Sequence, residues 1–99
     1  MLKTTETEIL DCKDIEFKAV TSLTVENTSS ENVTVSVGYK VGSFVNILFD
    51  NVVTASEKLE LIQENEILHL EENCSLVGIA SKENAIEIKV VENGWLSKF

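Results

Sequence analysis

Alternation of apolar and polar side chains with a period of two is the feature that most restricts the fold of this chain. In residues 15–25 the odd positions form one face, and residues 33–41 repeat the pattern with Val33, Val35, Val37, Tyr39 and Val41. A strand with one buried face has this period, whereas an amphipathic helix repeats every 3.6 residues. No window keeps a helical period over three turns, so the sequence predicts an all-β fold.

Turn-forming residues divide the chain into short strands. Residues 27–32 (NTSSEN) are predicted to join the two alternating runs as a hairpin, and Gly42 with Ser43 marks the next turn. The apolar run at residues 44–49 is predicted to be a strand covered on both faces. Further strands are expected at residues 6–10, 59–61, 67–70, 74–80 and 85–91.

The spacing of these strands indicates one domain with two packed sheets. About eight strands at intervals of roughly 8–12 residues favour an antiparallel β-sandwich or a jelly-roll-like fold. Residues 55–70 contain Glu, Lys and Leu, which favour a helix by propensity, but Asn65 interrupts that segment and we expect strands there. The 99 residues are predicted to form a single domain, 1–99, with residues 93–99 as an apolar tail.

The charge balance excludes two classes of partner. The chain has 17 acidic residues against 8 basic ones, all Lys, which gives a formal net charge of −9. Nucleic-acid binding depends on Lys and Arg neutralising phosphates, and docking on anionic membranes depends on basic patches. We therefore expect neither a nucleic-acid nor a membrane partner. Because the N-terminal residues contain no apolar segment, we expect no secretory signal and synthesis in the cytoplasm.

The chain offers little for catalysis or metal binding. Its single histidine, His69, could pair as a base only with a cysteine such as Cys74, but no motif surrounds this pair. We expect His69 at or near the surface. Cys12 and Cys74 are expected as thiols, although a bridge between strands stays open. The three His and Cys residues lack zinc-ligand spacing, and the acidic loops match no calcium motif. The sequence thus predicts no enzyme activity, no cofactor and no metal.

The C-terminal tail is unusually apolar for a chain end. It contains Trp95, Leu96 and Phe99, whereas a frayed tail is normally polar. Packing against its own sandwich and anchoring to a partner are both open. Trp95, Leu96 and Phe99 are therefore the candidate partner-interface residues.

Residues 19–30 (AVTSLTVENTSS) resemble a pattern found in small tailed-phage virion proteins. In those proteins a strand similar to TSLTV and a turn similar to NTS lead into alternating valines, as residues 33–37 do here. The resemblance continues at residues 51–53, 59–61 and 68–74, and it covers residues 8–92. The chain departs from the pattern in its acidic loops and in lacking Pro and Gly before two strands.

The resemblance implies a non-enzymatic virion protein made in the host cytoplasm. The preferred role is that of a capsid decoration, or cement, protein. Such a protein lies on the capsid exterior and contacts the major capsid protein, commonly as a homotrimer. A neck or tail accessory protein is the alternative within the virion. A small carbohydrate- or protein-binding module stays open as a different class, because β-sandwiches carry many kinds of site. An exposed aromatic platform would favour such a module.

Overall fold

The computed structural model describes residues 1–12, 18–62, 67–70, 74–92 and 95–98. Within these ranges the chain forms nine strands and no helix. The strands are β1 (Thr7–Cys12), β2 (Lys18–Asn27), β3 (Val33–Val41), β4 (Phe44–Val53), β5 (Lys58–Glu60), β6 (Leu68–Leu70), β7 (Cys74–Ala80), β8 (Ile86–Glu92) and β9 (Trp95–Lys98). β5 and β6 overlap the strands predicted at residues 59–61 and 67–70, so the strand interpretation is confirmed there, and the described residues between 55 and 70 contain no helix.

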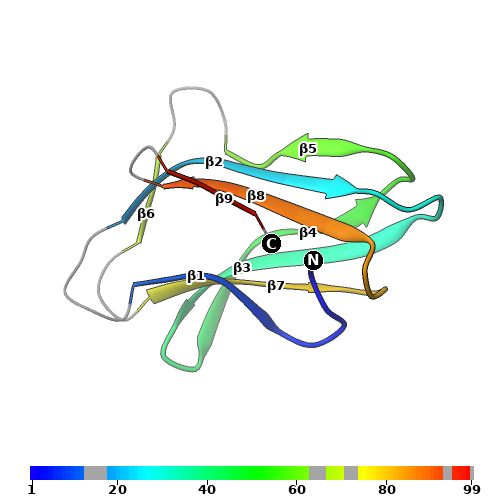
Figure 1. Ribbon diagram of the computed structural model, residues 1–99. Helices are drawn as coiled ribbons and strands as arrows, with labels where there is room; N and C mark the ends of the chain where they lie inside the picture. The colour runs from blue at the N-terminus through cyan, green and yellow to red at the C-terminus, as the bar shows by residue number, and fades with distance from the viewer. Residues whose placement is uncertain (13–17, 63–66, 71–73, 93–94, 99) are drawn as a thin grey trace.

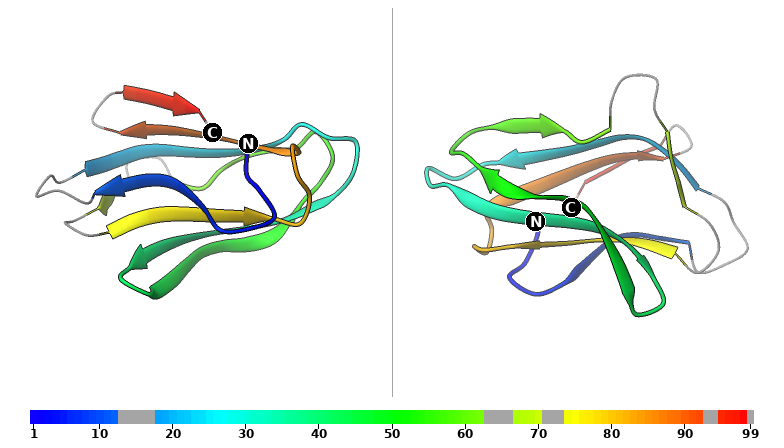
Figure 2. Two further views of the ribbon diagram at one scale, coloured as in Figure 1. Left: turned by 60° about the horizontal axis from the view of Figure 1, so that its bottom comes forward. Right: turned by 180° about the vertical axis from the view of Figure 1, so that it is seen from behind.

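Two antiparallel sheets pack face to face, as Figure 1 shows. Sheet A has the order β1-β7-β3-β4, and sheet B has the order β5-β2-β8-β9, with β6 also paired to β2. The predicted β-sandwich is therefore confirmed. In the left panel of Figure 2, sheet A runs from β1 (blue) through β7 (yellow) and β3 to β4 (green) at its lower edge.

The core lies between the sheets and follows the alternating residues of the central strands. Ile86, Ile88 and Val90 of β8 are fully buried, as the period of that strand predicts. On the opposite sheet, Val33, Val35 and Val37 of β3 are buried just as completely, so the prediction of an inward face on β3 is confirmed for these three residues. Burial of an aliphatic side chain contributes roughly 1.5–3 kcal/mol, so these side chains hold the layers together.

The predicted hairpin between the first two alternating runs is wrong. β2 belongs to sheet B and β3 to sheet A, so the turn that follows Asn27 carries the chain from one layer to the other. The Asn27 side chain is fully buried, and its amide donates hydrogen bonds to the carbonyls of Glu31 (2.7 Å) and Val53 (2.9 Å). A turn held in this way directs the chain across the core instead of back along the same sheet.

The inward face of β2 also differs from the prediction. A register shift between Val20 and Ser22 changes which side chains point inward. Val20 is fully buried and Thr21 is exposed, whereas strict alternation would place Thr21 inside. After the shift, Leu23 and Val25 face the core as predicted. Ile15 and Phe17 lie outside the described residues.

β4 was expected to be covered on both faces, and the structure corrects this. The strand continues through the predicted break at Asp50 and Asn51 to Val53, and it forms an edge of sheet A. Phe44 is 65% exposed and Ile47 is 57% exposed. The apolar run therefore reflects an uncovered strand edge.

The N-terminal residues close one side of the sandwich. Leu2 is fully buried, and its amide donates to the Ile86 carbonyl of sheet B at 2.9 Å. The next residue, Lys3, accepts a hydrogen bond from the Ala80 amide of sheet A at 3.0 Å. These first residues thus join the two layers, a role that the alternation pattern did not indicate.

Candidate functional site

The outer faces of the two sheets differ in polarity. Register and alternation place Thr24, Glu26, Lys58, Glu60, Glu87 and Lys89 on the outer face of sheet B. The corresponding face of sheet A is mainly aliphatic on β4 and β7, where it carries Val45, Ile47, Val52, Val77 and Ile79, with Asp50 as the one charged residue in the β4 row. The outer face of a sandwich is normally polar, because water covers it. Sheet A therefore presents the unusual surface.

Small residues on β3 make this face a groove. Thr34, Ser36 and Gly38 occupy the outward positions of β3, between the aliphatic rows of β4 and β7. A Cβ atom on Gly38 would lie 2.5 Å from Val45 Cγ1, so the Val45 side chain rests directly on the glycine backbone. We call this feature the β3 groove, with Thr34, Ser36 and Gly38 as its floor, and Val45, Ile47, Val52, Val77 and Ile79 as its walls.

Three adjoining hollows follow the β3 groove. Their volumes are about 440, 170 and 430 Å³. Ser36 and Ile79 line both the first and the second hollow, and Glu6 and Val77 line both the second and the third. Because neighbouring hollows share residues, they form one shallow depression along the sheet.

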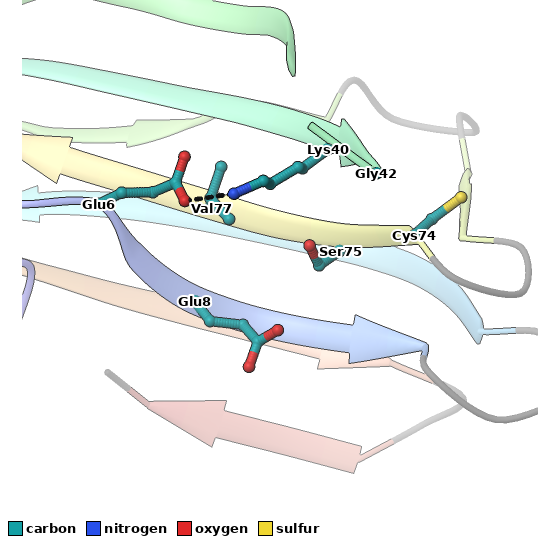
Figure 3. Close-up of a pocket in the computed structure, with 7 residues that line it drawn as sticks. All are labelled: Glu6, Glu8, Lys40, Gly42, Cys74, Ser75 and Val77. Carbon is teal, nitrogen blue, oxygen red and sulfur yellow. Dashed lines mark hydrogen bonds and ion pairs between the residues drawn. The ribbon is translucent and has the colours of Figure 1, made fainter. Parts of the chain in front are cut away.

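An ion pair stands where the second and third hollows meet. Figure 3 shows the Glu6 and Lys40 side chains meeting beside Val77, with a Glu6 Oε2 to Lys40 Nζ distance of 2.6 Å. Their side chains are 48% and 30% exposed, and a pair in such contact with water adds only about 0–1 kcal/mol to stability. The pair therefore brings charge to the junction of the second and third hollows, and Asp50 brings a carboxylate to the first. The aliphatic lining is concentrated in the second hollow, at Val45, Ile47, Val77 and Ile79.

A second apolar depression lies between β4 and sheet B. It has a volume of about 190 Å³ and is lined by aliphatic residues alone, namely Leu23, Leu48, Leu61, Ile62, Ile67 and Leu68. Leu48 and Ile67 at its rim are 46% and 49% exposed. The apolar surface of β4 therefore extends from the outer face of sheet A into the opening between the layers.

Glu60 holds the chain in place beside this second depression. Its carboxylate accepts hydrogen bonds from the Ser22 hydroxyl and from the Leu23 amide, the latter at 2.9 Å. Burial acts to raise the pKa of Glu60, but these hydrogen bonds outweigh it, so the pKa lies below the ordinary carboxyl value. The ionised carboxylate thus fastens the end of β5 to β2.

We expect Glu60→Gln to lower Tm at pH 7 by several degrees. Because folding lowers this pKa, the contribution is fully present above the unfolded-state pKa and disappears as pH falls through the folded-state pKa. The difference in Tm between wild type and variant should therefore shrink as pH falls below the ordinary glutamate pKa of 4.5 and through the lowered pKa of Glu60. Thermal unfolding followed by circular dichroism measures it. Glu87→Gln, which alters a partly exposed pair with Lys89 at a distance of 3.9 Å, is the control, and an equal loss there would contradict a specific role for Glu60.

The structure places the two candidate catalytic residues in different sheets. His69 is exposed in β6 of sheet B, as predicted, and Cys74 is buried in β7 of sheet A. The Tyr39 hydroxyl donates a hydrogen bond to Cys74 Sγ at 2.9 Å. The register sets the Cα of Cys12 opposite that of Cys74, so the question of a bridge between these strands stays open.

The backbone of the C-terminal tail pairs with the chain's own sandwich. β9 lies antiparallel to β8, with Trp95 opposite Glu92 and Leu96 opposite Val91. The side chains of Trp95 and Leu96, and the whole of Phe99, lie outside the described residues. Their assignment as partner-interface residues stays a prediction.

The described residues also bear on metals and membranes. Among them, no cluster of three or more His, Cys, Asp or Glu side chains is placed to hold a metal ion. None of the described segments is a helix with the length and apolar character needed to cross a bilayer.

Sequence reasoning missed the residues of the β3 groove. The available signal was the segment from Phe44 to Val53, which contains a single charged residue, Asp50, in a chain with a net charge of −9. Alternation on β7 gave a second signal, since Val77 and Ile79 stand where a solvated face would carry polar residues.

Comparison with known proteins adds no relative. No family model matches the sequence, and neither the curated proteins nor the solved structures include a significantly similar chain. The likeness to phage virion proteins therefore stays a prediction.

Proposed function

We propose that this chain is a non-enzymatic structural protein that docks the β3 groove onto a larger protein, as a decoration subunit on the exterior of a phage capsid. The observation that carries the docking step is the contrast between the two outer faces: aliphatic rows flank small residues on sheet A, and charged residues cover sheet B. The virion setting rests on the sequence resemblance.

The shape of the groove suits a protein partner. A depression formed by three shallow adjoining hollows accepts a ridge of side chains or a strand, whereas a small ligand requires a deeper enclosure. Exposed apolar surface bordered by charges is typical of protein interaction sites. The Glu6–Lys40 pair, where the second and third hollows meet, and Asp50 at the first hollow supply the charges beside the apolar stretch.

The charge distribution orients the subunit on its partner. A net charge of −9 repels acidic surfaces, and the charges of sheet B would face away when the β3 groove is covered. A capsid protein would gain buried apolar area at the groove, while the mixed charges on the outer face of sheet B stay in water. These consequences require no catalytic group.

We expect Ile79→Lys to reduce occupancy of this chain on its particle at least tenfold. Ile79 lines two of the three hollows and is 39% exposed, so a lysine there places a charge inside the docking surface without opening the core. Thr24→Lys adds the same charge to the outer face of sheet B and is the matched control. Occupancy is measured by quantitative mass spectrometry of purified particles. Equal occupancy of the two variants would overturn the assignment of the groove.

The copy number in purified virions of the encoding phage tests the virion assignment itself. Hundreds of copies, in a fixed ratio to the major capsid protein, would support a decoration protein. About a dozen copies would favour a neck or tail accessory protein instead. Complete absence would overturn the virion assignment and favour a binding module that uses the same groove.

A further inference from the structure

The edges of the two sheets differ in how they are protected. β1 is an edge with a register irregularity between Glu8 and Leu10 and with acidic residues along it. The sheet B strands β5, β6 and β9 contain only three, three and four residues. Irregularities, charges and short length are the usual devices that stop an edge from pairing with another chain.

β4 lacks most of these devices. It is ten residues long and carries one charge, Asp50, and both of its faces expose large apolar side chains. Its one irregularity, where Leu48 is the extra residue opposite β3, lies at the middle of the strand. A strand of ten residues spans about 33 Å, and pairing along it would form up to about ten main-chain hydrogen bonds. This edge therefore has the length and composition of a pairing surface.

The sequence of β4 is self-complementary about its midpoint. Read from both ends toward the centre, FVNILFDNVV pairs Phe44 with Val53, Val45 with Val52, Asn46 with Asn51, Ile47 with Asp50, and Leu48 with Phe49. Four of these five pairs match apolar with apolar or amide with amide.

The sheet geometry allows the same pairing. In an antiparallel ladder, directly opposed residues lie on the same face of the sheet. In a regular strand of even length, residues at equal distances from the two ends lie on opposite faces. In β4 the extra residue Leu48 shifts the alternation by one, so that residues at equal distances from the two ends lie on the same face. Register with β3 accordingly places Val45 and Val52 on the outer face, and Asn46 and Asn51 on the inner face. The central irregularity therefore makes the two halves of β4 match.

We propose that β4 pairs antiparallel with β4 of a second copy of this chain, about a twofold axis at Leu48 and Phe49, so that two A sheets become one continuous eight-stranded sheet. A twofold axis brings the same surface of both copies together, which self-complementarity requires. This dimer is independent of the proposed function, because it uses the strand edge and leaves Ile79 free.

The distribution of charge favours β4 over other edges as the place where two copies pair, and it also determines the register of the pairing. Two chains of net charge −9 repel each other, and of the two edge strands of sheet A, β4 carries one charge whereas the shorter β1 carries two. In the proposed register Asp50 stands opposite Ile47 of the second copy. A shift that set Asp50 opposite itself would place like charges in direct contact, which is destabilising.

The test uses Asn46 and Asn51, which are exposed and stand opposite each other across the proposed axis. N46K/N51K sets lysine opposite lysine at two places in the dimer, whereas N46K/N51E sets lysine opposite glutamate at both. Sedimentation equilibrium should give wild type and N46K/N51E a mass twice the 11.0 kDa of one chain. We expect the dissociation constant of N46K/N51K to rise at least tenfold.

General charge repulsion works against this expected result, which makes the comparison stringent. Two added lysines change the net charge from −9 to −7, whereas one lysine and one glutamate leave it at −9. Circular dichroism establishes that both variants fold. A monomeric wild type at millimolar concentration, a trimeric mass, or equal dimerisation of the two variants would each overturn the proposal. Ile79→Lys should leave the dimer intact, so failure of the dimer and failure of groove docking are separate results.

Discussion

Replacing Asn27 with alanine is expected to lower the free energy of unfolding by about 2–4 kcal/mol. The side chain is fully buried, and its amide donates to two carbonyls, those of Glu31 and Val53. Its Oδ1 atom also accepts hydrogen bonds from the amide and the hydroxyl of Ser29, at 2.9 and 2.7 Å. Alanine would leave the buried Val53 carbonyl without this donor and would release the turn that changes sheets. Chemical denaturation measures the loss.

The control is the same substitution at an exposed asparagine of that turn. Asn32 Oδ1 accepts one hydrogen bond from the Ala55 amide at 3.2 Å, so Asn32→Ala should cost less than about 1 kcal/mol. Asn27→Asp keeps the acceptor but removes both donors, and it should be no more stable than Asn27→Ala. A stable Asn27→Asp variant would show that the two donated hydrogen bonds contribute little.

Leu2→Ala is expected to lower the free energy of unfolding by about 2–5 kcal/mol, although it changes a residue next to the chain end. The Leu2 side chain is fully buried and packs over Gly78, where an added Cβ would lie 3.0 Å from Leu2 Cδ2. Truncation would leave a cavity between the layers, and the flat backbone at Gly78 has no side chain to fill it. Thermal and chemical unfolding both measure this loss.

Ile79→Ala is the matched control for Leu2→Ala. It removes the same number of carbon atoms from a side chain that is 39% exposed, so it should cost less than about 1 kcal/mol. If both variants lost the same stability, Leu2 would not act as part of the core.

Alternation predicted the strands well but not which sheet each strand joins. Val33, Val35 and Val37, and also Ile86, Ile88 and Val90, are buried as their period indicates. The period is a local property, whereas the crossing after Asn27 depends on a hydrogen bond to Val53, 26 residues further along the chain. Pattern reasoning sees neighbours in sequence, so it assigned a hairpin to a turn that joins two layers.

The candidate site was harder to predict because an apolar strand has two physical explanations. A run such as residues 44–49 fits a strand covered on both faces and also fits an edge that awaits a partner. Only the sheet order distinguishes them, by placing β4 beside β3 alone. For the tail at Trp95 the sequence left packing against its own sandwich and anchoring to a partner open, and the structure shows its backbone paired with β8.

The pairing of the earliest strands with the latest ones determines when this protein can fold. β1 lies beside β7, and β2 pairs with β8 as far as Glu92, so sheet A requires the residues of β7 and sheet B those of β8 before either can be completed. The β3–β4 hairpin, closed at Gly42, can form by itself much earlier. Non-local pairing is slow, on the order of milliseconds to seconds. During synthesis we therefore expect the apolar edge of β4 to form before the core that lies behind it, which makes this edge the first surface of the chain exposed to aggregation.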